Sequence, residues 1–237
     1  MRWRLRGRGR LIEVTSSIPL GGFLILIVLV IAGVYASVFS LARDVERRRV
    51  TGYQAYCSAR GYTYLHVRPG GEAEYVGVVE MFRHGASHIW RHEITGPNFV
   101  AFEYLYTAGF DDRSGAYRAA MIKWEDANTH RPRFAAGPKA LLDRIAPLVH
   151  APDIDFPEDP DFSKLYVVRG VDRDPVRRLF RPAVRAQLVA NPGQQLAGDG
   201  PILFWWRFGG LPPPELLDAF LAAAAQVKRL LTSPAGD

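Results

Sequence analysis

Residues 88–124 read HIWRHEITGPNFVAFEYLYTAGFDDRSGAYRAAMIKW, and this stretch decides the fold of the polar part of the chain. It contains three strand-like runs, at residues 88–95, 99–107 and 116–124. The turn sequences Gly96-Pro97-Asn98 and 111–115 separate these runs. Strand-like runs joined by short turn-rich links predict an antiparallel meander.

Further strands and helices are predicted on both sides of this meander. Strands are expected at residues 62–67, 131–137, 165–169, 194–197 and 202–208. Helices are expected at residues 44–60, from Pro138, at 174–180 and from Pro182, since Pro is well tolerated in the first turn of a helix. The acidic, proline-broken residues 151–161 are expected to form a solvated connector.

The clearest helix of the polar part closes the chain. Its apolar residues follow the spacing of one helix face: Leu216, Leu217, Phe220, Leu221, Ala224, Val227, Leu230 and Leu231. The predicted fold class is therefore α+β, with one N-terminal transmembrane helix and an antiparallel sheet that helices cover on one face. The long C-terminal amphipathic helix completes it.

An apolar segment near the N-terminus carries no charged residue between Glu13 and Arg43. Since a hydrocarbon core of about 30 Å needs about 20 helical residues, we expect a membrane helix at residues 18–42. The alternative is a secretory signal peptide cleaved after Ser40-Leu41-Ala42. The length of the apolar run and the arginines directly after it favour a retained anchor.

These features divide the 237 residues into five parts. They are a basic N-terminal tail (1–17), the transmembrane helix (18–42), a juxtamembrane helix (43–60), an α+β domain (61–232) and a C-terminal tail (233–237). The domain is long enough to bury a core of its own. We expect a plasma-membrane protein with a single span.

The positive charge does not predict a nucleic-acid partner. The formal charge is +6, but much of the excess flanks the span, whereas a nucleic-acid binder carries its basic stripe on the folded domain. Five arginines stand on each side of the span, so the positive-inside rule leaves its orientation open: Arg2, Arg4, Arg6, Arg8 and Arg10, then Arg43, Arg47, Arg48, Arg49 and Arg60. Cys57 is the only cysteine, which excludes an internal disulfide.

Two features near the span suggest partners. Ala32, Ala36 and Ser40 repeat a small residue every four positions, which allows two membrane helices to approach closely and form a homodimer. Anionic lipid could be bound by four juxtamembrane arginines, each worth about 1 kcal/mol near the surface: Arg43, Arg47, Arg48 and Arg49. The simpler interpretation is that these arginines only set the topology.

Several phrases resemble an uncharacterised family of bacterial, chiefly actinobacterial, single-span membrane proteins. The phrases are FEYLYT at 102–107, DIDF at 153–156 with DFSKLY at 161–166, and VRRLF at 176–180 with Pro182, Val184, Pro192 and Gly198. The resemblance covers residues 43–232 and implies a cytoplasmic domain with no assigned activity. The arginine-rich tail before the span departs from the family's pattern.

A histidine cluster and a tryptophan pair are the remaining candidate sites. His84, His88 and His92 recur every four residues and could hold a zinc or iron ion on a helix. The alternation around them instead predicts a strand on which His88, Trp90, His92 and Ile94 share a face. Trp205 and Trp206 are expected on opposite faces of their strand, so that at least one is exposed at an interface.

The sequence contains no Gly-rich phosphate loop, nucleophile elbow or metalloprotease pair, so we lean against an enzyme and expect no cofactor. The leading hypothesis is a non-enzymatic accessory or interaction domain on a membrane anchor, with a protein partner or the bilayer as its target. One alternative is a membrane-tethered metalloenzyme using His84, His88 and His92. Another is anionic-lipid binding through the juxtamembrane arginines.

Overall fold

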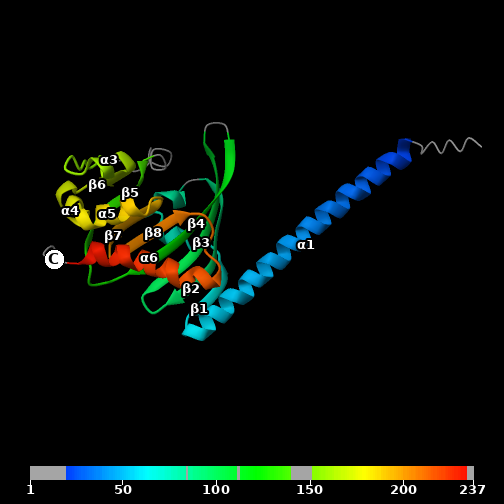
Figure 1. Ribbon diagram of the computed structural model, residues 1–237, viewed down its shortest axis with the longest axis horizontal. Helices are drawn as coiled ribbons and strands as arrows, with labels where there is room; N and C mark the ends of the chain where they lie inside the picture. Colours follow the sequence, from blue (N-terminus) through cyan, green and yellow to red (C-terminus); the bar gives the residue numbers. More distant parts are fainter. Residues whose placement is uncertain (1–19, 84, 111–112, 140–150, 234–237) are drawn as a thin grey trace, which may run out of the picture. The chain divides into compact units, whose positions relative to one another are not determined.

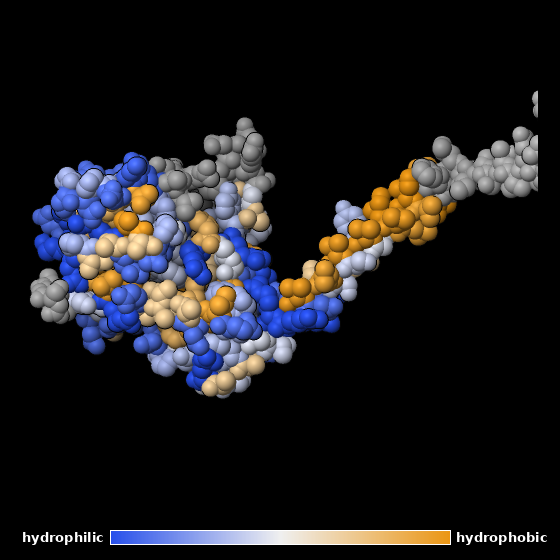
Figure 2. All heavy atoms as spheres, viewed as in Figure 1, coloured by the Kyte–Doolittle hydropathy of each residue, from blue (hydrophilic) through white to orange (hydrophobic). Residues whose placement is uncertain are grey.

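The computed structural model describes residues 20–83, 85–110, 113–139 and 151–233. The chain divides into two compact units, Met1–Arg47 and Arg48–Asp237. One continuous helix, α1 (Leu20–Arg60), contributes to both. It is the one helix in the described ranges that is long and apolar enough to cross a membrane, and it lies near the N-terminus. Figure 2 shows mostly hydrophobic residues along its first part, with some paler ones among them, followed by hydrophilic residues.

The last part of α1 belongs to the core of the second unit, which confirms the helix expected at residues 44–60. Tyr53, Tyr56 and Cys57 are buried. The helix ends before Gly61, whose φ of +68° is the left-handed conformation that closes many helices at low steric cost. The backbone N–H of Tyr62 donates to Cys57 O at 2.9 Å, and the chain then enters the first strand.

Eight antiparallel strands form one sheet, in the order β1-β2-β3-β4-β8-β7-β5-β6 (Figure 1). Their bounds are β1 Thr63–Arg68, β2 Ala86–Gly96, β3 Phe99–Phe110, β4 Arg113–Glu125, β5 Arg131–Pro138, β6 Tyr166–Gly170, β7 Gln194–Gly200 and β8 Ile202–Phe208. The predicted meander is confirmed as β2, β3 and β4, with β1 added at its edge. β7 runs on to Gly200, three residues beyond the end expected at residue 197.

Helices cover the first face of this sheet, as predicted. They are α3 Pro160–Leu165, α4 Arg173–Leu179, α5 Pro182–Ala190, α6 Pro214–Thr232 and the end of α1. Alternate residues of the strands pack against them, among them Ile122 and Trp205. α6 buries Leu217, Phe220 and Ala224 with Val227 and Leu231, whereas Leu216 of the predicted stripe is exposed.

The second face is also covered, which the sequence did not predict. Residues 69–83 lie over it and contain two short 3₁₀ turns, η1 Ala73–Tyr75 and η2 Glu80–Arg83. Tyr75, Met81 and Phe82 from this segment are buried against aromatic residues of β2, β3 and β8. The sheet therefore has a core on each of its faces.

The connector at 151–161 is less solvated than expected. Ile154 and Phe156 are buried in the first-face core, and Asp153 forms an isolated bridge with Arg169 of β6. Asp159 caps α3 by accepting a hydrogen bond from the backbone N–H of Phe162 at 3.2 Å. The helix expected from Pro138 falls on residues 140–150, outside the described part of the chain.

Candidate functional site

An irregularity in β2 turns the side chain of His92 toward the first face. His92 has a φ of +51°, and the register with β3 shifts between Arg91 and Ile94. A β-bulge inserts one extra residue and so reverses the facing of the residues that follow. Trp90 consequently packs in the second-face core and Ile94 in the first-face core. The prediction that His88, Trp90, His92 and Ile94 share a face is wrong for this reason.

Just before the bulge, Arg91 pairs in regular register with Glu103 of β3, whose carboxylate is fully buried. Arg91 donates from Nε to Glu103 Oε1 at 2.7 Å, and its Nη2 lies 2.6 Å from the same oxygen. Arg49 of α1 donates from Nη2 to Oε2 at 3.1 Å, and the backbone N–H of Leu211 donates to Oε2 at 2.9 Å. Arg118 of β4 places its Nε 3.7 Å from Oε1. We call these five residues the Glu103 cluster.

The electrostatics of the cluster keep the carboxylate charged. Burial raises the pKa of Glu103, but the positive charges of Arg91 and Arg49 and their hydrogen bonds together outweigh burial and hold it below its ordinary value. A carboxylate held ionised in this way is a poor proton donor or acceptor near neutral pH. The cluster is therefore suited to joining elements of the fold.

Tyr53 extends the cluster to the loop between β8 and α6. Its hydroxyl lies 3.1 Å from Leu211 O and 3.0 Å from Pro212 O, and Arg49 Nη2 donates to the same hydroxyl at 3.1 Å. Arg49 also donates to Leu211 O at 3.2 Å. The end of α1, three central strands and the loop before α6 thus meet around Glu103.

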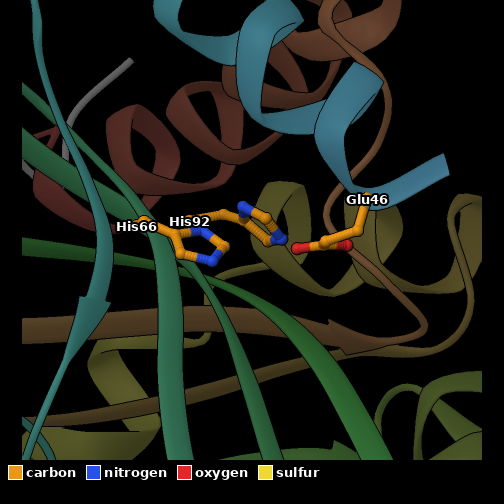
Figure 3. Close-up of side chains that lie close together, drawn as sticks. All are labelled: Glu46, His66 and His92. Carbon is orange, nitrogen blue, oxygen red and sulfur yellow. The ribbon is translucent and has the colours of Figure 1, made fainter. Parts of the chain in front are cut away.

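Beside the cluster lies a group of aromatic and imidazole rings. Figure 3 shows His66 of β1 and His92 of β2 side by side, with ring centroids 5.3 Å apart. The Tyr64 hydroxyl lies 2.8 Å from His92 Nδ1, and the Tyr53 ring centroid lies 5.1 Å from that of His92. Glu46, also labelled in the figure, belongs to the first unit.

The structure places two of the three predicted histidines, His88 and His92, on opposite faces of the sheet. His88 packs on the second face, where its ring stacks on Tyr104 and its Nδ1 lies 2.5 Å from the Tyr104 hydroxyl. His92 lies on the first face, and His84 is outside the described residues. Burial, and after it the charge of Glu72, raises the pKa of Tyr104, so its hydroxyl stays protonated.

Trp205 and Trp206 lie on opposite faces of β8, as the alternation predicts. The expectation that one of them is exposed is wrong, since both are buried. Trp205 packs edge-on against Phe220 of α6 and donates from Nε1 to Gln194 Oε1 at 2.8 Å. Trp206 belongs to the second-face core.

The four juxtamembrane arginines have different environments. Arg43, Arg47 and Arg48 are exposed, and the guanidinium of Arg43 lies 4.7 Å from the ring centroid of Phe39. Arg49 instead is half-buried and belongs to the Glu103 cluster. Its guanidinium is therefore engaged by the domain.

A groove of about 460 Å³ runs along α6. One wall is aromatic, with Tyr62, Phe99 and Trp124 from the sheet side, and α6 provides Leu221, Ala222 and Ala225. We call it the α6 groove. Tyr62 and Phe99 meet edge to face at 5.4 Å, so the aromatic wall is packed in place.

The two ends of the α6 groove differ in charge. Asp218, at one end, accepts hydrogen bonds from the Tyr56 hydroxyl at 2.7 Å and from Arg60 at 2.5 Å, which lower its pKa in that order. Lys228 and Arg229 line the other end. Lys228 Nζ lies 5.7 Å from the ring centroid of Trp124.

A further cation, Arg131, acts electrostatically on Lys228. Arg131 is only 7% exposed; its Nη1 donates to Pro201 O at 3.0 Å, whereas its Nη2 is buried with no hydrogen-bond partner within the described ranges. Burial, and next the charge of Arg131, lower the pKa of Lys228, while Asp126 acts in the opposite direction. Asp126 is itself held by the Thr129 hydroxyl at 2.7 Å.

Sequence reasoning missed both the Glu103 cluster and the α6 groove. The available signal was Glu103 itself, a single acid within the apolar run 99–107. An acid placed among strand residues that pack in a core needs a buried cation as partner. The partners, however, come from α1, β2 and β4, which only the fold brings together.

No family model matches this chain, and no curated protein matches it. Among solved structures, the chain is similar to the crystal structure of the mycobacterial trehalose monomycolate transport factor A, TtfA. The sequence identity is 10% and the TM-score is 0.49, over 81% of this chain and 99% of that chain.

Proposed function

We propose that this chain is a single-pass membrane protein whose α+β domain acts as a non-enzymatic accessory module beside the bilayer. The observation that carries the proposal is the exposed apolar surface of α1. Large apolar side chains from Leu24 to Leu41 are exposed along it, with exposed fractions of 55% and 66% at those two residues. A surface of this length and composition is stable when lipid covers it.

The Glu103 cluster supports the accessory role. Its carboxylate is held by guanidinium groups and a backbone N–H, and Arg49 makes the end of α1 part of that arrangement. Because the helix runs without interruption from Leu20 to Arg60, the anchor continues directly into the core of the domain. A paired, ionised carboxylate of this kind suits a structural role in a domain whose function is to bind a partner.

The experiment is membrane fractionation of the full chain followed by alkaline carbonate washing. The wild-type chain is expected to stay in the washed membranes. Leu26→Asp combined with Leu29→Asp is expected to release it, because an acid at the centre of a span costs about 3 kcal/mol. Leu65→Asp is the matched control, since Leu65 is exposed on β1 in the domain. A wild-type chain that washes off would overturn the proposal.

We further propose that the domain is cytoplasmic. The arginine count on the two sides of the span is equal, and the resemblance given above supports the cytoplasmic side. A reporter fused after Asp237 and active only in the cytoplasm tests this side. Activity of a reporter that works only in the periplasm, fused at the same position, would contradict the cytoplasmic side and place the domain in the periplasm.

Binding of anionic lipid is a second candidate, favoured by the exposure of Arg43, Arg47 and Arg48. It is tested with the full chain in nanodiscs, by co-flotation with anionic vesicles at low salt. Changing these three arginines to Gln is expected to abolish flotation. Salt at 0.5 M should do the same, because the Debye length is then only about 4 Å and the charges are screened. Flotation that is equal for wild type and variant would exclude this role.

A further inference from the structure

We propose that the α6 groove binds a single-chain anionic amphiphile, with its apolar chain along α6 and its carboxylate or phosphate head at Lys228. This inference goes beyond the proposed function and rests on separate observations, because every residue of the groove belongs to the second unit.

The size and walls of the groove fit an apolar chain. A volume of about 460 Å³ falls within the roughly 300–1,000 Å³ usual for small-molecule sites. Tyr62, Phe99 and Trp124 form one wall, while Leu221, Ala222 and Ala225 form the other. Apolar chains bind such walls because binding removes apolar surface from water, and no directional contacts are needed. The lining thus combines an apolar strip with polar side chains, Asn98 and Thr232 among them, which fits an amphiphile.

The charge at the Lys228 end selects for an anion. Lys228 and Arg229 line this end of the groove. Lys228 forms no salt bridge with a carboxylate of the described residues, while the neighbouring carboxylate of Asp126 is held by Thr129 and by the backbone N–H of Asn128. An anionic head beside Lys228 would supply the counter-charge that no carboxylate of the described residues provides through a salt bridge.

The opposite end fixes the direction of binding. Asp218 is already paired with Arg60 and accepts a hydrogen bond from Tyr56. Because Arg60 is already engaged by Asp218, this end offers a second anion no unpaired cation among the described residues, so the head lies at Lys228 and the chain points toward Asp218. The expected ligand is thus apolar over most of its length and negative at one end only.

The test uses the full chain in nanodiscs of zwitterionic lipid, with a diazirine-bearing fatty acid as probe. After irradiation, mass spectrometry locates the labelled peptides. We expect labelling of α6 and of the peptides that contain Phe99 and Trp124. Unlabelled dodecanoate is expected to compete, whereas dodecyltrimethylammonium of the same chain length is not.

Two variants separate the groove from general partition into lipid. Ala222→Trp fills the groove from an exposed position of α6, and Lys228→Gln removes the charge. Each is expected to reduce labelling of α6 about tenfold, the effect of losing one charge-assisted contact or the space for the chain. Lys164→Gln, at an exposed position of α3, is the matched control and should label like the wild type.

Equal labelling in wild type, Ala222→Trp and Lys228→Gln would overturn the proposal, as would equal competition by the cationic amphiphile. Displacement of the probe by an acidic peptide but not by dodecanoate would also overturn it and assign the groove to a protein partner. Unfolding curves of the variants in nanodiscs show whether lost labelling reflects lost folding. The carbonate wash is a separate readout, so failure of the anchor and failure of the groove are distinguishable.

Discussion

Arg49 and Glu103 are 54 residues apart in the chain, and their side chains meet with Arg49 Nη2 3.1 Å from Glu103 Oε2. This pair joins the end of α1 to the centre of the sheet. Arg91 completes the pairing from β2, on the side of Oε1. The stability of the domain should therefore depend strongly on one carboxylate.

Changing Glu103 to Gln is expected to lower the free energy of unfolding by about 3 kcal/mol, because guanidinium groups would stay partly buried without their counter-charge. Urea unfolding of the full chain in nanodiscs, followed by tryptophan fluorescence, measures this. Glu125→Gln is the control: its side chain is 56% exposed and pairs with Lys123 at the surface, so its loss should cost about 0–1 kcal/mol. Equal effects of the two variants would contradict the structural role of Glu103.

The contribution of Glu103 should also depend on pH. Its pKa is lower in the folded chain than in the unfolded chain, so the stabilisation is present above the unfolded pKa and is lost as the pH falls through the folded value. The difference in stability between wild type and Glu103→Gln should be largest near pH 7 and shrink below about pH 4. A difference that does not change between pH 7 and pH 3 would argue against an ionised, paired Glu103.

The sequence predicted the elements whose residues repeat regularly. The meander and α6 were predicted correctly, because strand alternation and helical spacing each extend over many residues. Residues 69–83 were missed because their short 3₁₀ turns leave no periodicity to detect. The bulge at His92 was missed because a reversal of facing within β2 depends on its register with β3.

The candidate sites were harder to predict for a related reason. The expected histidine cluster relied on spacing along one segment, and the bulge separates His88 from His92. The Glu103 cluster and the α6 groove depend on residues that are distant in sequence, and periodicity carries no information on such contacts. Trp205 and Trp206 were placed on the correct faces, but their burial depends on both faces being covered.

Cys57 should react slowly with thiol reagents in the folded chain. It is 2% exposed, and burial raises the pKa of its thiol from 9.0 to about 11, with Arg60 acting weakly in the other direction. That shift alone leaves about 100-fold less thiolate at pH 8. Reaction with a chromogenic disulfide should be slow without denaturant and complete rapidly in urea. Because the chain has one cysteine, fast release of the chromophore by the folded chain would contradict the burial of Cys57.

Two glycines with positive φ should differ in their tolerance of alanine. A Cβ at Gly85 would lie 1.9 Å from Thr107 O, whereas a Cβ at Gly61 would meet nothing within 4 Å. Gly61→Ala should therefore lower the free energy of unfolding only by the strain of alanine in the left-handed conformation, about 1 kcal/mol. Gly85→Ala should cost more than about 3 kcal/mol, because the β3 backbone must also move. Comparable unfolding curves for the two variants would contradict the packing between Gly85 and β3.

The most direct test of a retained membrane anchor is the intact mass of the chain recovered from carbonate-washed membranes. The full chain of 26.5 kDa is expected, with the apolar part of α1 still attached to the domain. A chain that has lost the residues up to Ala42, or that is recovered only in the soluble fraction, would contradict the account and identify the apolar segment as a cleaved signal.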